Sequence, residues 1–176
     1  MENKKKEKAL KFDSKLADCW SKDRSKCELY ITEGDSASGN LKTARDNEFQ
    51  AVMPIRGKML NLQKATIEKI QKNAEVMTII EALGLELNPK TLKYEVPPQG
   101  LRYGKVIIAT DADADGENIT CLLLTMMYRL LPTLIKEGRI YKVRTPLYEI
   151  TYEDKTIVYA FNETEYATII KALQKK

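Results

Sequence analysis

The chain has 176 residues, of which 43% are hydrophobic, so it can bury one substantial core and we expect a single main domain. Its 29 basic and 25 acidic residues leave a net charge of only +4, so the total charge does not by itself indicate a nucleic-acid-binding protein. The sequence contains no histidine, and its three cysteines lack CxxC spacing, which argues against a disulfide scaffold, a zinc site and the usual general base. Because no apolar run is long enough to span a bilayer or follow the basic N-terminus as a signal sequence, we expect a soluble, cytoplasmic protein without membrane contact.

Residues 1–14 are polar and lysine-rich, and we expect a flexible lead-in or the remnant of a linker. The first strand-like run, Leu29 to Thr32, is followed at once by Glu33-Gly34-Asp35-Ser36-Ala37. Asp35 or Ser36 could cap a helix over about residues 37–45. Capping explains those two residues but leaves Glu33 unexplained.

A second short strand is expected over residues 51–53, followed by Pro54-Ile55-Arg56-Gly57-Lys58-Met59-Leu60-Asn61. Gly57 between two cations suits a tight loop that offers backbone N–H groups and positive charge to a phosphate. A solvated basic turn is the alternative. Helical periodicity follows over residues 63–73 and 74–83 and ends at Gly84, and the proline-containing residues 85–102 are expected to form a loop.

The segment Lys105 to Ile119 places three carboxylates directly after a buried strand, which we expect over residues 106–109. Apolar residues then recur at helical spacing from Ile119 to Ile135, so strand, acidic turn and helix follow one another. Ligands bind at the carboxyl ends of strands in open α/β sheets. If the two strands are neighbours, Glu33 faces Asp111, Asp113 and Asp115 across that edge.

Carboxylates held this close repel one another by roughly 4 kcal/mol per pair at 4 Å and an effective dielectric constant near 20. A divalent cation would remove that cost, and oxygen ligands favour Mg²⁺, with Mn²⁺ or Ca²⁺ as substitutes. A solvated acidic turn, with Asp115 capping the next helix, is the simpler alternative.

Two other motifs share this pattern. An EF-hand loop needs a bidentate Glu at its twelfth position, where this chain has Leu122, so a calcium sensor is not expected. A strand that ends in Asp-x-Asp also resembles haloacid-dehalogenase-type phosphatases, although that motif requires Thr or Val in place of Asp115. The phosphatase remains an alternative.

The last third of the chain predicts a strand over residues 139–144, a hairpin formed by residues 148–152 and 156–161, and a helix over residues 163–173. Together with the earlier elements, this pattern indicates an α/β protein.

The motifs Glu33-Gly34-Asp35-Ser36-Ala37, Pro54 to Asn61 and Asp111-Ala112-Asp113-Ala114-Asp115-Gly116 together resemble the Toprim domain of type IIA DNA topoisomerases, as found in the B subunit of DNA gyrase or topoisomerase IV. The resemblance implies a Rossmann-like parallel sheet flanked by helices, with a short C-terminal hairpin and helix. It also implies a Toprim domain over residues 15–176, with a C-terminal extension whose tail is incomplete.

The resemblance further implies an enzyme that cleaves and religates double-stranded DNA with Mg²⁺ and is inactive as a fragment alone. The nucleophilic tyrosine would come from a partner A subunit in an A2B2 heterotetramer, and ATP would act only through domains that precede residue 1. The implied residues fall into three sets. The metal ligands are Glu33, Asp111, Asp113 and Asp115; the catalytic residues are Glu33, Asp111, Asp113, Arg56 and Lys58; the DNA-binding residues are Asp35, Ser36, Arg56 and Lys58.

The chain departs from the family pattern after Asp115-Gly116. Glu117 and Asn118 stand where the family usually has a small residue and a histidine, and Ser38 replaces a glycine. The additional carboxylate raises a further alternative, a DNA- or partner-binding module without metal chemistry.

Overall fold

The structure is a computed structural model that describes residues 15–56 and 59–173. The lead-in predicted for residues 1–14 lies outside the described residues, as do Gly57 and Lys58 of the basic loop.

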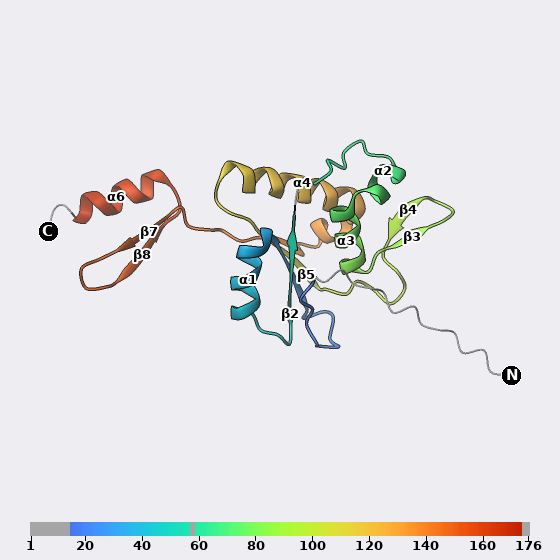
Figure 1. The fold of residues 1–176 in the computed structure, drawn as a ribbon, viewed down its shortest axis with the longest axis horizontal. Coiled ribbons are helices and arrows are strands. Elements are labelled where there is room, and N and C mark those ends of the chain that lie inside the picture. Colours follow the sequence, from blue (N-terminus) through green and yellow to red (C-terminus); the bar gives the residue numbers. More distant parts are fainter. Residues whose placement is uncertain (1–14, 57–58, 174–176) are drawn as a thin grey trace.

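A parallel four-stranded sheet organises the molecule (Figure 1). Its strands lie in the order β2-β1-β5-β6, and each neighbouring pair is parallel. Their bounds are β1 Glu28–Glu33, β2 Gln50–Ile55, β5 Lys105–Ala109 and β6 Ile140–Lys142. Thr32 near the end of β1 pairs with Ala109 at the end of β5, so the two strands finish side by side. We call the edge at which all four strands end the carboxyl edge.

Helices cover both faces of this sheet. In Figure 1 the sheet is seen nearly edge-on, with α1 on one side and α3 on the other. The helix bounds are α1 Gly34–Ala44, α2 Ile67–Lys72, α3 Ala74–Leu83, α4 Ala114–Leu130, α5 Pro132–Lys136 and α6 Glu163–Leu173. The core contains apolar side chains from strands and helices, and the largest fully buried ones include Leu29, Ile31, Met53, Ile79, Ile80, Leu83, Ile108, Leu123 and Met126. This packing confirms the predicted α/β fold.

Local capping fixes the helix ends near the sheet. The Asn73 side chain accepts a hydrogen bond of 2.9 Å from the Val76 N–H at the start of α3. Gly84 ends the same helix with a φ of +77°, a left-handed conformation that suits glycine. The predicted end of this helix is therefore confirmed.

The helical pattern expected from Ile119 to Ile135 is one long helix followed by a short one. Helix α4 begins earlier, at Ala114, and ends at Leu130, and Pro132 starts α5. Proline lacks an N–H and disfavours a helical conformation at the preceding residue, and Leu131 is indeed non-helical, with φ −138° and ψ 54°.

The loop expected over residues 85–102 is wrong in one part, because it contains a small antiparallel hairpin. Its strands are β3 Glu86–Asn88 and β4 Lys93–Glu95. The Asn88 side chain accepts hydrogen bonds from the backbone N–H groups of Lys90 and Thr91, which closes the turn. The prolines that suggested a loop lie in the turn and after the hairpin, where they interrupt no strand pairing.

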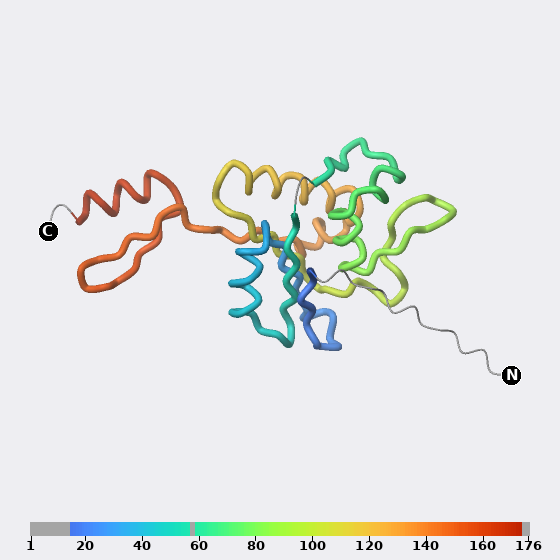
Figure 2. Tube along the Cα trace, viewed as in Figure 1, coloured from blue at the N-terminus to red at the C-terminus, as the bar shows by residue number. Residues whose placement is uncertain are grey.

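The C-terminal lobe, residues 148–173, projects from the sheet and is joined to it by one extended segment (Figure 2). It consists of the hairpin β7 Tyr148–Thr151 and β8 Ile157–Ala160, followed by α6, as the sequence predicts. Tyr148 and Tyr166 stack within the lobe, with ring centroids 4.3 Å apart. Every residue of α6 keeps part of its surface exposed. In the described ranges, no helix combines the length and the apolar character needed to span a bilayer.

Candidate metal centre at the carboxyl edge

Glu33 is the last residue of β1 and lies where the strand passes directly into α1. Gly34, with a φ of +71°, makes that direct turn possible. The helix therefore begins before Asp35 and Ser36, which lie exposed in its first turn, and the prediction that one of them caps it is wrong. Glu33 takes the capping position, yet its side chain makes no capping hydrogen bond with the described residues.

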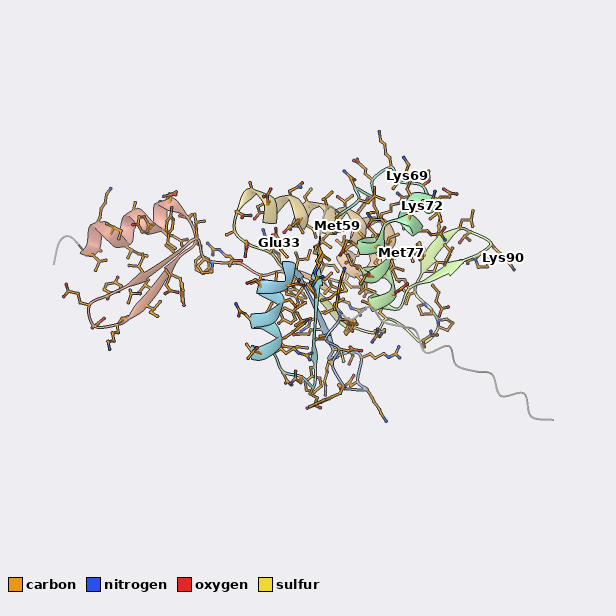
Figure 3. All side chains as sticks on the ribbon, in the orientation of Figure 1. Glu33, Met59, Lys69, Lys72, Met77 and Lys90 are labelled. Carbon is orange, nitrogen blue, oxygen red and sulfur yellow. The ribbon has the colours of Figure 1, made fainter. Side chains whose placement is uncertain are left out.

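The Glu33 carboxylate lies in an unfavourable environment. Its Oε2 atom is buried and has no hydrogen-bond partner among the described residues. Burial raises the pKa of this carboxyl group, and the negative charges of Asp113, Asp111 and Asp115 raise it further. Figure 3 shows Glu33 at the start of α1. Glu33 and the acidic segment, residues 111–115, therefore share one electrostatic environment, although they are distant in sequence.

The acidic segment turns tightly into α4. Asp113 is the residue that caps α4, and its Oδ1 accepts a hydrogen bond of 2.8 Å from the Gly116 N–H. The alternative in which Asp115 caps this helix is therefore wrong, and Asp115 lies in the first turn. A Cβ atom on Gly116 would lie only 2.3 Å from the Asp111 carbonyl oxygen. Glycine is thus required for the backbone of Asp111 to approach the helix.

A buried pair of hydroxyl groups anchors the base of this segment. The hydroxyl groups of Thr110 and Thr120 are 2.9 Å apart and join the end of β5 to α4. From the other side, the Thr145 hydroxyl donates to the Thr110 carbonyl at 3.1 Å. Because these bonds fix Thr110, the aspartates that follow it project from a rigid base.

The donors at this edge fit a hard divalent cation. They are carboxylate oxygens, and the buried Glu33 Oε2 has an unused lone pair whose burial a cation would compensate. In residues 15–56 and 59–173, no three acidic side chains already form a closed set of metal ligands. Instead, Glu33, Asp111, Asp113 and Asp115 lie along one edge and interact through their charges.

Arg56 comes directly after β2 and so reaches the same edge. Its guanidinium binds both carboxylate oxygens of Asp35, with an Nε to Oδ1 distance of 2.9 Å. Its backbone N–H donates to Glu75 at 3.0 Å. The structure thus brings together two of the predicted DNA-binding residues, whereas Lys58 lies outside the described part of the chain. Lys69 and Lys72, two basic residues later in the sequence, are on α2 at another corner of the molecule (Figure 3).

Two cations at this edge were missed by the sequence reasoning. Lys142 ends β6 and forms an ion pair with Glu117, and Arg144 follows two residues later. Both line a pocket of about 260 Å³ that also includes Asp111. The rule that ligands bind where parallel strands end would have found them, because their strand was predicted.

Comparison with known proteins agrees with this geometry. Residues 28–145 match the family model of the Toprim domain. The chain is 46% identical over 162 residues to the B subunit of DNA gyrase from Thermotoga maritima, covering 92% of this chain and 24% of the relative. It is 43% identical over 152 residues to the B subunit of the type 2 topoisomerase from Aquifex aeolicus, covering 86% and 18%.

Among solved structures, the chain resembles the DNA-binding, cleavage and re-ligation domain of Plasmodium falciparum topoisomerase II. The TM-score is 0.77 at 30% identity, and the match covers 91% of this chain and 22% of that one. The chain thus spans about a quarter or less of the proteins it matches. The family model covers all four strands of the sheet, the candidate site and the helices between the strands, and the chain belongs to the Toprim domain family.

Proposed function

We propose that this chain is the Mg²⁺-binding DNA-cleavage and religation core of a type IIA DNA topoisomerase. The observation that carries the proposal is the buried, unpartnered oxygen of Glu33, which shares its electrostatic environment with Asp111, Asp113 and Asp115. Such an arrangement costs stability in the absence of a cation, because burial and repulsion both oppose ionisation. Relatives named as the B subunits of DNA gyrase and of a type 2 topoisomerase support the reaction class.

In this proposal, the four carboxylates hold Mg²⁺. When bound, the cation polarises the scissile phosphodiester and stabilises negative charge on the leaving 3′ oxygen. Arg56 neutralises a neighbouring phosphate, and Asp35 fixes the plane of its guanidinium through the two-oxygen contact. The exposed Ser36 hydroxyl and Lys58 supply further contacts to the DNA backbone.

The nucleophile is proposed to be a tyrosine of a partner A subunit, in an A2B2 assembly that acts on double-stranded DNA. The names of the relatives, which are B subunits, support a separate partner. ATP would act through other parts of the longer B chain, and the complex would work in the cytoplasm.

Asp113→Asn in a complete B chain, mixed with its A subunit and supercoiled plasmid, tests the proposal. Asparagine keeps the capping oxygen of α4 but removes the charge, so we expect a loss of Mg²⁺-dependent cleavage and religation with little change in folding. Glu137→Gln, on an exposed side chain before β6, is the charge-matched control. Unchanged cleavage by Asp113→Asn would contradict the metal assignment.

The alternatives have less support. The additional carboxylate of Glu117 forms an ion pair with Lys142, and a negative charge does not oppose the binding of a cation nearby. A phosphatase of the haloacid-dehalogenase type is not supported by the family match, which is to the Toprim domain.

A further inference from the structure

The carboxyl edge continues past the metal centre into a second, cationic cluster. Lys142 and Arg144 come at and just after the end of β6, the strand beside β5. Their pocket of about 260 Å³ is also lined by Asp111 of the acidic segment, Glu117 of α4, Leu147 just before the C-terminal lobe and Phe161 within that lobe. Because Asp111 belongs to both sites, the pocket adjoins the metal centre directly.

The contacts of Lys142 and Arg144 leave both side chains able to bind a phosphate. Lys142 pairs with Glu117, whose side chain is 61% exposed. Arg144 lies over the Phe161 ring at 4.3 Å and makes a longer contact of 3.4 Å to Glu165. Exposed ion pairs contribute little to stability, so exchanging Glu117 for another anion costs little. Stacking on Phe161 keeps the guanidinium plane oriented while its N–H groups remain available.

We propose that this pocket binds a DNA backbone phosphate next to the one held at the metal centre, through Lys142 and Arg144. The inference rests on the proposed function, since it extends the path of the same DNA strand along the carboxyl edge. In the free protein Glu117 forms an ion pair with Lys142. When DNA binds, the phosphate replaces Glu117 as the partner of Lys142.

The charges around the pocket favour a polyanion over a small free anion. Asp111 and Glu117 repel an isolated phosphate ion that enters the pocket alone. A DNA strand also contacts Arg56 and the cation at the same edge, so these attractions hold the next phosphate beside Lys142 despite the acidic neighbours.

Binding of a short fluorescein-labelled DNA duplex to this chain, measured by anisotropy over a KCl series with Mg²⁺ present, tests the proposal. Lys142→Met and Arg144→Met should each weaken binding several-fold at low salt and reduce the slope of log K against log salt by about one. Lys136→Met is the matched control, because Lys136 ends α5 just before β6 and so lies toward the opposite edge. Its slope should match that of the unmodified chain.

Glu117→Gln separates the exchange model from a general charge effect. Freeing Lys142 should tighten DNA binding, and the same change in a Lys142→Met background should have no effect, whereas a general charge effect would persist there. The proposal is overturned if Lys142→Met and Arg144→Met bind DNA as Lys136→Met does, or if duplex binding is undetectable at low salt. Titration of Mg²⁺ into the same variants distinguishes a failure of this proposal from a failure of the proposed function. If the variants bind both Mg²⁺ and DNA as the unmodified chain does, only the phosphate pocket is rejected.

Discussion

The two acidic strand ends at the carboxyl edge differ in what else their carboxylates do. Asp113, after β5, is exposed and caps α4 through the Gly116 N–H. Glu33, at the end of β1, is half-buried, and its Oε2 has no hydrogen-bond partner among the described residues. The Asp113 side chain therefore contributes to the fold as well as to the site. The Glu33 side chain opposes folding, which points to a role outside the fold.

Gly116→Ala should produce the largest change in stability, because it places a methyl group of α4 against the backbone of Asp111, which follows β5. The added Cβ would meet the Asp111 carbonyl oxygen at 2.3 Å, a backbone atom that cannot rotate away. We expect a loss of about 3 kcal/mol in the free energy of unfolding, measured by urea denaturation. Gly39→Ala in α1 is the control, since its Cβ would have open space among the described residues and alanine favours a helix. Equal stability of the two variants would show that the close approach at Gly116 is unimportant.

Asp113→Ala and Asp113→Asn should separate the two roles of Asp113. Alanine removes the cap and should cost about 1 kcal/mol, whereas asparagine retains a capping oxygen and should leave stability nearly unchanged. Both should lose Mg²⁺ binding, measured by calorimetric titration. If the alanine variant were as stable as the asparagine variant, the 2.8 Å bond to the Gly116 N–H would contribute nothing to the helix.

Glu33→Gln should change the free energy of unfolding in the opposite direction. Burial and the three aspartates raise the Glu33 pKa, so its ionised form is unfavourable in the folded chain. Removing this charge should stabilise the cation-free protein at neutral pH by on the order of 0.5–2 kcal/mol. Thermal unfolding in the presence of a chelator measures the change, with Glu149→Gln on an exposed strand position as control. A destabilised Glu33→Gln variant would mean that the carboxylate has a structural role after all.

Asp35→Asn should have the smallest effect on stability. Its side chain and that of Arg56 are 56% and 55% exposed, so their ion pair should contribute less than about 1 kcal/mol. We expect an unchanged midpoint of urea unfolding and a small decrease in DNA affinity, because Arg56 loses the partner that orients it. A decrease of several kcal/mol in the free energy of unfolding would show that the Asp35–Arg56 pair stabilises the fold, as the Asp113 cap does.

Much of the candidate site could be predicted because its acidic residues lie at the ends of strands. Val106 to Ala109 reads as a buried strand, and Glu33 and Asp111 each follow such a run, so a parallel sheet brings them to one edge. The resemblance to Toprim domains added the proposed DNA-binding roles of Asp35 and Ser36, which helix capping would otherwise explain.

The remainder depended on backbone detail that residue types do not specify. Whether Asp113 or Asp115 caps α4 is decided by where the helix starts, and that depends on the fit of Gly116 against Asp111. The hairpin over residues 86–95 is stabilised by side-chain bonds from Asn88 within a proline-containing segment. The pairing of Glu117 with Lys142 joins α4 to β6 and has no signal in either segment alone.

The most direct test of the account is calorimetric titration of Mg²⁺ into the unmodified chain, Glu33→Gln and Asp113→Asn. The account predicts binding to the unmodified chain and loss of it in both variants, although Glu33→Gln is the more stable protein. Mg²⁺ binding by Glu33→Gln with the affinity of the unmodified chain would contradict a shared centre built from both strand ends.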